Sequence, residues 1–89
     1  SRAYSGLLWS VYRKLAARMG DDNRANALMF GALARVGDDL DSCAITGADF
    51  VKALQTSARR FIGREEGSQL AQEVVAMMEA EARRRKIIS

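Results

Sequence analysis

The sequence predicts an all-α protein, either a four-helix bundle or a compact orthogonal helical domain. Apolar residues recur at intervals of three and four in successive segments, which is the spacing of one face of an α-helix. Proline is absent, so glycines and polar clusters are the signals that separate these segments. Apolar and polar residues nowhere alternate between turn residues as they do in a half-buried strand. We expect one domain over residues 1–89, either a whole protein or a fragment of a longer chain.

The first predicted helix runs from about Ser5 to Met19. Gly20 follows it and is suited to the left-handed conformation that ends many helices. Asp21 and Asp22 then offer a side-chain oxygen that caps the start of a second helix. The apolar stripe of the first helix consists of Leu8, Val11, Tyr12, Leu15 and Met19.

The second predicted helix runs from about Asn23 to Val36, and Gly37 is expected to end it. Apolar residues lie on both of its sides, and such a helix is normally buried on both sides. We therefore predict that it is the central helix of the domain, or that it lies at a self-association interface. The stripe is Ala25, Leu28, Met29, Ala32, Leu33 and Val36, and the opposite side carries Ala27, Phe30, Gly31 and Ala34.

A loop over residues 38–45 separates this helix from a third, which begins after Thr46 and runs to Ile62. Thr46 and Asp49 have the spacing of a capping box, with Asp in place of the usual Glu or Gln. Gly63 is expected to end the third helix. Its apolar stripe consists of Phe50, Val51, Leu54, Ala58, Phe61 and Ile62.

The fourth predicted helix begins between Arg64 and Ser68 and ends near Arg85. Basic residues gather at its carboxyl end, where positive charge suits the helix dipole. Ile87 and Ile88 follow, and they are expected to dock on the core, to join a partner, or to be no more than a scar of truncation. The stripe of this helix is Leu70, Ala71, Val74, Val75 and Met78.

Residue types that carry most enzymatic chemistry are missing. Histidine is absent, which removes the commonest general base and the usual imidazole metal ligand. The single cysteine, Cys43, forms neither an intramolecular disulfide nor a zinc site alone, and no phosphate-binding glycine loop occurs. We predict that the protein is not an enzyme and holds no cofactor, metal or small-molecule substrate. A reducing, cytoplasmic location is the default expectation, and no segment is long enough to span a membrane.

The acidic loop resembles the calcium loop of an EF-hand. With Asp38 as first ligand, Asp49 falls at the twelfth position. Three departures weaken the resemblance: Leu40 stands at a ligand position, Cys43 replaces the turn glycine, and the twelfth residue is Asp rather than Glu. A capped, solvated loop is the preferred interpretation, with a degenerate EF-hand-like domain as an alternative.

Aromatic and apolar residues outside the helical stripes are the candidate partner-binding residues. Trp9 projects about 120° from the centre of the first stripe, at about 100° per residue, and Phe30 does much the same on the second helix. Such residues either pack on another helix of the domain or form a patch for a partner. We therefore predict a non-enzymatic protein-interaction or regulatory module that dimerises or docks on a larger protein. Its candidate residues are Tyr4, Leu7, Trp9 and Phe30.

Basic clusters support an alternative, a nucleic-acid-binding regulator. The formal net charge is +3, and phosphates bind to clustered lysine and arginine. Against this alternative, acidic residues are interspersed and no helix-turn-helix pattern is present. A further alternative is an accessory subunit of an enzyme complex. The candidate nucleic-acid-binding residues are Arg59, Arg60, Arg64, Arg83, Arg84, Arg85 and Lys86.

Overall fold

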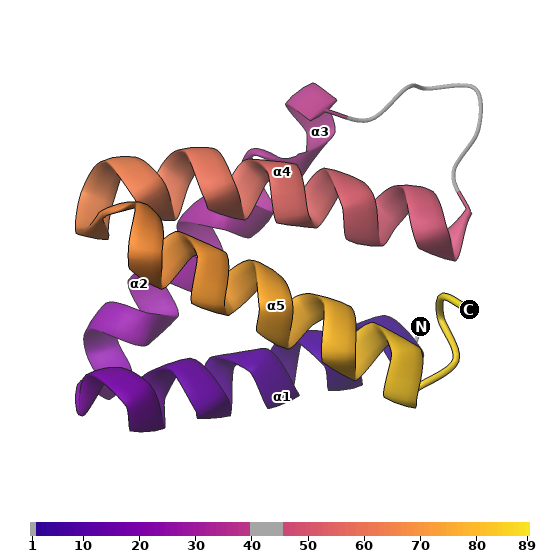
Figure 1. Ribbon diagram of the computed structural model, residues 1–89, viewed down its shortest axis with the longest axis horizontal. Coiled ribbons are helices and arrows are strands. Elements are labelled where there is room, and N and C mark those ends of the chain that lie inside the picture. Colours follow the sequence, from indigo (N-terminus) through magenta and orange to yellow (C-terminus); the bar gives the residue numbers. More distant parts are fainter. Residues whose placement is uncertain (1, 40–45) are drawn as a thin grey trace.

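The computed structural model describes residues 2–39 and 46–89 and confirms the all-α class (Figure 1). Four long helices and one single-turn helix account for most of these residues, and no β-strand occurs among them. No helix in these two ranges is both long and apolar enough to cross a bilayer. The helices are α1 (Arg2–Met19), α2 (Asp22–Ala34), α3 (Val36–Asp39), α4 (Gly47–Glu66) and α5 (Ser68–Arg84).

The four long helices close into a ring in which each contacts two others. α4 and α5 form an antiparallel hairpin, and α5 lies along α1 (Figure 1). α2 runs from α1 to α4 and contacts both. α2 is inclined to the other three helices, and α3 follows it against α4. The arrangement is a helical bundle with one inclined member.

One hydrophobic core fills the ring, and all four long helices contribute to it. The helical stripes predicted from the sequence supply most of its members. Leu7 is fully buried in this core, so its assignment to a partner surface is wrong. The largest fully buried apolar side chains are Leu7, Val11, Leu15, Leu28, Val51, Leu54, Ile62, Val74 and Met78.

Three predicted helix ends are confirmed. Gly20 has a φ of +68°, the left-handed conformation, and its N–H donates to the carbonyl of Ala16. The Asp21 carboxylate accepts a hydrogen bond of 2.9 Å from the backbone N–H of Arg24, capping α2. Thr46 and Asp49 form a reciprocal capping box with two hydrogen bonds of 3.1 Å at the start of α4.

Two predicted helix ends are wrong. α4 continues through Gly63 to Glu66, because Gly63 keeps helical geometry where α4 approaches Ala71 of α5. Gly67, with a φ of +103°, ends it instead. α2 ends at Ala34, two residues before the predicted Val36, and Gly37 lies within α3.

The prediction that α2 is buried on both sides is wrong. Its inner face consists of Ala25, Leu28, Met29 and Ala32, all buried. Phe30 is 66% exposed and Leu33 is 37% exposed on the other side. α2 is therefore a peripheral helix with an uncovered apolar face, and the alternative of a self-association interface stays a prediction.

A close contact between α2 and α4 depends on a glycine. A Cβ at Gly31 would overlap the ring of Phe61, so only glycine lets this ring lie against the α2 backbone. The Arg35 guanidinium stacks 4.4 Å from the Phe61 ring centroid and donates a 3.0 Å hydrogen bond to the Gly31 carbonyl. Beside it, the buried Ser57 hydroxyl donates to the Ala32 carbonyl at 2.5 Å.

A buried carboxylate joins the end of α5 to α1. Glu81 is 1% exposed, and its oxygens accept from Arg84 Nη2 at 2.5 Å and Arg85 Nε at 2.8 Å. Lys14 of α1 approaches it at 3.4 Å. Hydrogen bonds from Arg84, then from Arg85 and Lys14, outweigh the desolvation that burial imposes and lower the Glu81 pKa to about 2.

The chain after α5 folds back onto the core. Lys86 adopts a left-handed conformation with a φ of +60°, and the N–H of Ile87 donates to the Ala82 carbonyl at 2.9 Å. Ile87 and Ile88 are partly buried against the core. Of the three alternatives for these residues, docking on the core is confirmed.

The burial of Glu81 predicts a specific dependence of stability on pH. Its folded-state pKa lies below the ordinary value of 4.5, so the ionised group stabilises the fold above pH 4.5 and loses this effect as pH falls toward 2. At pH 7, Glu81→Gln should lower the free energy of unfolding by about 2 kcal/mol, because charge-assisted hydrogen bonds are replaced by neutral ones.

Urea denaturation of both proteins from pH 7 to pH 2.5 measures this effect. The stability difference between wild type and Glu81→Gln should shrink steadily below pH 4.5. Glu73→Gln is the matched control, because its ion pair with Arg18 is partly exposed and its loss should cost less than about 1 kcal/mol. A pH-independent difference for Glu81→Gln would contradict the prediction.

The Gly31 contact predicts an unusual response to alanine. Gly31→Ala should destabilise the fold by about 1–2 kcal/mol, because the Phe61 ring must move and the Arg35 stack is disturbed, despite alanine's higher helix propensity. Gly37→Ala is the control, since its Cβ would meet open space and should leave stability unchanged or slightly raised. Thermal unfolding followed by circular dichroism compares the two; equal effects would refute the contact.

Candidate protein-interaction groove

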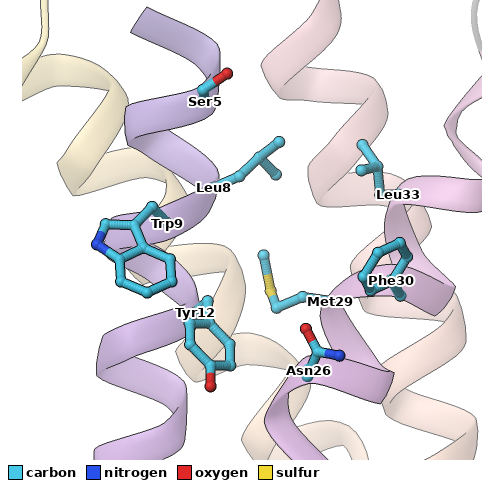
Figure 2. A pocket seen from close by; sticks show the side chains of 8 residues that line it. All are labelled: Ser5, Leu8, Trp9, Tyr12, Asn26, Met29, Phe30 and Leu33. Atoms are coloured by element: carbon cyan, nitrogen blue, oxygen red, sulfur yellow. The ribbon is translucent and has the colours of Figure 1, made fainter. Parts of the chain in front are cut away.

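An apolar groove runs between α1 and α2 (Figure 2). Its volume is about 410 Å³, and it is open to solvent rather than enclosed. In Figure 2, Leu8 and Met29 are directed into the space between the two helices, while Trp9 and Phe30 lie at its opposite rims. The residues that line this α1–α2 groove are Ser5, Leu8, Trp9, Tyr12, Asn26, Met29, Phe30 and Leu33.

Helical periodicity places these residues together. The four contributed by α1 are spaced i, i+3, i+4 and i+7, and the four contributed by α2 repeat the same spacing. On each helix this groove strip lies beside the strip that enters the core, which includes Leu7 and Val11 on α1 and Leu28 and Ala32 on α2. The groove strip is therefore covered only in part: Met29 is buried, Leu8 and Tyr12 are partly buried, and Trp9, Phe30 and Leu33 are exposed.

The groove carries all the large apolar side chains that are exposed in the described part of the chain. Trp9 is 60% exposed, and with Phe30 and Leu33 it completes this group. The Trp9 and Tyr12 rings lie 5.4 Å apart between centroids at an angle of 32°. Tyr12 thus supports one face of the indole, while the remaining surface of Trp9 is open to solvent.

The structure sorts the predicted partner-binding residues into three environments. Trp9 and Phe30 line the groove, and Leu7 lies in the core. Tyr4 is half-buried on the α4 side, where its ring packs 5.0 Å from Phe50 and its hydroxyl approaches Gly47. The groove residues that were not selected as binding residues are Leu8, Tyr12, Met29 and Leu33.

The sequence places these four residues on the inner stripes, and this is confirmed for three of them: Met29 is buried, and Leu8 and Tyr12 are partly buried against the core. Leu33 is exposed. The sequence signal for the groove is the spacing i, i+3, i+4, i+7, which occurs on both helices. Trp9 on α1 and Phe30 on α2 each occupy the i+4 position. A second apolar strip on two consecutive helices indicates a surface that the two helices share.

Positive charge lies beside the Trp9 rim of the groove. A second hollow, between α1 and the end of α5, is lined by Trp9 together with Arg13, Lys14, Arg84 and Arg85. A third hollow on α1 contains Trp9, Arg13 and the carboxylate of Asp22. Asp22 is the only acidic residue that lines any of these three hollows, so the Trp9 rim is a basic rim defined by Arg13, Lys14, Arg84 and Arg85.

The predicted nucleic-acid-binding residues do not form one surface. Arg59, Arg60 and Arg64 are exposed on the second half of α4, whereas residues 83–86 lie at the end of α5. Because α4 and α5 are antiparallel, these clusters lie at opposite ends of the hairpin (Figure 1). Arg83 also pairs with Glu79 at 2.7 Å, and Arg84 and Arg85 pair with Glu81.

The EF-hand hypothesis falls mostly outside the described residues, which exclude 40–45 and thus Leu40 and Cys43. Within the described ranges, no group of three potential metal ligands occurs. One oxygen of Asp49, the predicted twelfth ligand, accepts a hydrogen bond from the Thr46 backbone.

Compared with protein-family models, with curated proteins and with solved structures, the chain shows no match in any of the three comparisons. The functional interpretation of the groove accordingly rests on its own geometry and chemistry. Its lining offers apolar contact area and aromatic rings. Its basic rim offers donors for an anionic group.

Trp9 is the only tryptophan, so its fluorescence reports directly on the Trp9 rim. We expect red-shifted emission, because most of the indole is exposed to water. Relative to free N-acetyltryptophanamide, the ratio of iodide to caesium quenching should be higher for Trp9, since the cations of the basic rim concentrate anions around the ring. This excess should fall with added salt. Blue-shifted emission that neither ion quenches would show that Trp9 is buried.

Proposed function

We propose that this domain is a non-enzymatic protein-interaction module that binds its partner through the α1–α2 groove. The observation that carries the proposal is the gathering of Trp9, Phe30 and Leu33 in one open groove, while the other large apolar side chains described are at least partly buried. Contiguous apolar surface of this kind marks interaction sites in soluble domains.

The chemistry of the groove suits protein recognition. Trp and Tyr are enriched among the residues that dominate binding energy, and they sit best in a pocket that a partner can dehydrate. Trp9 forms one rim with the tilted ring of Tyr12 beside it, and Phe30 forms the other, so a partner side chain entering between them contacts aromatic surface on two sides. The absence of histidine supports the non-enzymatic part of the proposal.

The nucleic-acid alternative receives less support from the same structure. Its predicted residues fall into two clusters at opposite ends of α4 and α5, and part of their charge is paired with glutamates. An accessory subunit of an enzyme complex would use the same groove and is one case of the proposed function. We retain protein binding as the conclusion.

The test compares wild type with the double variant Trp9→Ala/Phe30→Ala. Both side chains are mostly exposed, so each substitution should change stability by no more than about 0.5 kcal/mol. Leu7→Ala, two residues from Trp9 but fully buried, should cost about 2–5 kcal/mol and serves as the contrast.

Two measurements then decide the proposal. Sedimentation equilibrium over a range of protein and salt concentrations reports self-association. Affinity purification from native extract, with wild type and with the double variant as bait, reports other partners. Wild type should associate in one of the two assays, and the folded double variant should lose that association. The proposed function would be refuted if the wild type is monomeric in sedimentation and captures from extract the same proteins as the double variant.

A further inference from the structure

We propose that the partner of the α1–α2 groove is an acidic amphipathic helix, whose apolar face enters the groove and whose carboxylates meet the basic rim. This inference rests on the proposed function and names the chemistry of its partner. Three observations carry it: the length of the groove strips, the open shape of the groove, and the sign of the charge beside Trp9.

The length of the groove matches a short helix. The lining residues extend from Ser5 to Tyr12 on α1 and from Asn26 to Leu33 on α2. Seven helical steps cover about 10 Å, or two turns. A partner helix presents anchors at i, i+3 or i+4, and i+7 over the same distance, which is the usual spacing of helix-in-groove recognition.

The shape of the groove favours a polypeptide over a small molecule. Sites for small molecules enclose most of the ligand surface, whereas this groove is open to solvent rather than enclosed. Trp9 and Phe30 stand at opposite rims with Leu8 and Met29 between them (Figure 2). A rod with an apolar face contacts both rims and the floor at once, whereas a flat membrane surface meets only the rims.

The charge of the basic rim selects an acidic partner. Lys14, Arg84 and Arg85 share the single buried carboxylate of Glu81, which leaves two positive charges in excess. Arg13 adds a third charge, is exposed, and forms no ion pair with any side chain in the described ranges. A carboxylate on the flank of the bound helix would lie against these groups.

The same charge disfavours a second copy of this chain as the partner. The chain has a net charge of +3, and α1 itself carries four basic residues and no acidic one. A symmetric contact through the groove would bring the basic rims of two copies toward each other, and like charges across an interface weaken binding. The acidic helix avoids this repulsion.

The probe is a displayed library of helical peptides about four turns long, roughly 14 residues. Each peptide carries Leu, Ile, Phe or Met at i, i+3 or i+4, and i+7, and its flanking positions are randomised among Glu, Lys, Gln and Ser. Wild-type protein is the bait, and the Trp9→Ala/Phe30→Ala variant removes peptides that bind elsewhere. The enriched peptide is then synthesised and titrated against purified variants.

We expect the enriched peptides to carry Glu along one flank. Trp9→Ala should weaken their binding by about 30-fold or more, as for a buried aromatic hot spot. Arg13→Ser should weaken binding by about threefold and Arg13→Glu by about tenfold, with a smaller dependence on salt than wild type. Arg59→Ser is the matched control, an exposed arginine on α4 that lines none of the three hollows, and should leave affinity unchanged.

Each other outcome overturns the inference. Enriched peptides that are neutral or basic but still require Trp9 would overturn the acidic partner and leave the proposed function standing. A wild-type dimer that the Trp9→Ala/Phe30→Ala variant abolishes would make the occupant a second copy. Trp9-dependent binding to vesicles of phosphatidylserine and phosphatidylcholine, without any enriched peptide, would assign the surface to a membrane. If no probe binds through Trp9, the inference fails, and the association assays above judge the proposed function separately.

Discussion

The buried Glu81 carboxylate is the interaction on which both the closure of the bundle and the character of the groove depend. A carboxylate that is 1% exposed is stable in a core only when cations and hydrogen bonds replace its lost water. Lys14 supplies one such group from α1, and Arg84 and Arg85 supply the others from the last turn of α5 and its C-cap. This arrangement fixes α5 along α1 and holds the two arginines beside Trp9. Gly6 leaves room for this position of the Arg85 guanidinium, which a Cβ at residue 6 would displace.

Packing of α2 explains why the groove exists at all. α1 and α2 are joined by the short Gly20–Asp21 turn, and α2 then inclines away toward α4 (Figure 1). Gly31 and Phe61 set how closely α2 approaches α4, and this contact uses a different side of α2 from the one that carries Phe30. Two helices that share one end and diverge leave their second apolar strips facing a common hollow. The domain has no further helix in its described ranges to cover it.

Local features of the fold were predictable from sequence because they depend on neighbouring residues. The caps at Asp21 and Thr46 and the left-handed Gly20 follow from side-chain chemistry over three or four residues. Gly63 was misjudged because glycine ends a helix only where it adopts a positive φ, and Gly63 lies inside α4 without one.

The site was harder to predict, because periodicity identifies apolar faces without showing which face another helix covers. Leu7 and Trp9 are both apolar and two residues apart, and one is fully buried while the other is 60% exposed. The basic rim could not be predicted either, because it joins Arg13 and Lys14 to Arg84 and Arg85 across most of the chain length. The packing of α5 along α1 brings these residues together, and the ion pairs at Glu81 hold Lys14, Arg84 and Arg85 in place.

Arg84 and Arg85 bind Glu81 and also belong to the basic rim, because a guanidinium has more N–H donors than the Glu81 carboxylate accepts. Arg84 directs Nε and Nη2 at Glu81, which uses one side of its planar fork, and its side chain remains 66% exposed. Arginine carries five N–H donors, so those on the outer side point toward solvent and are free for a second carboxylate. Glu81 orders the guanidinium before any partner arrives, and a donor held in place loses less conformational entropy on binding than a mobile one. A buried carboxylate that stabilises the fold thereby also preorganises the positive surface that we propose a partner helix meets.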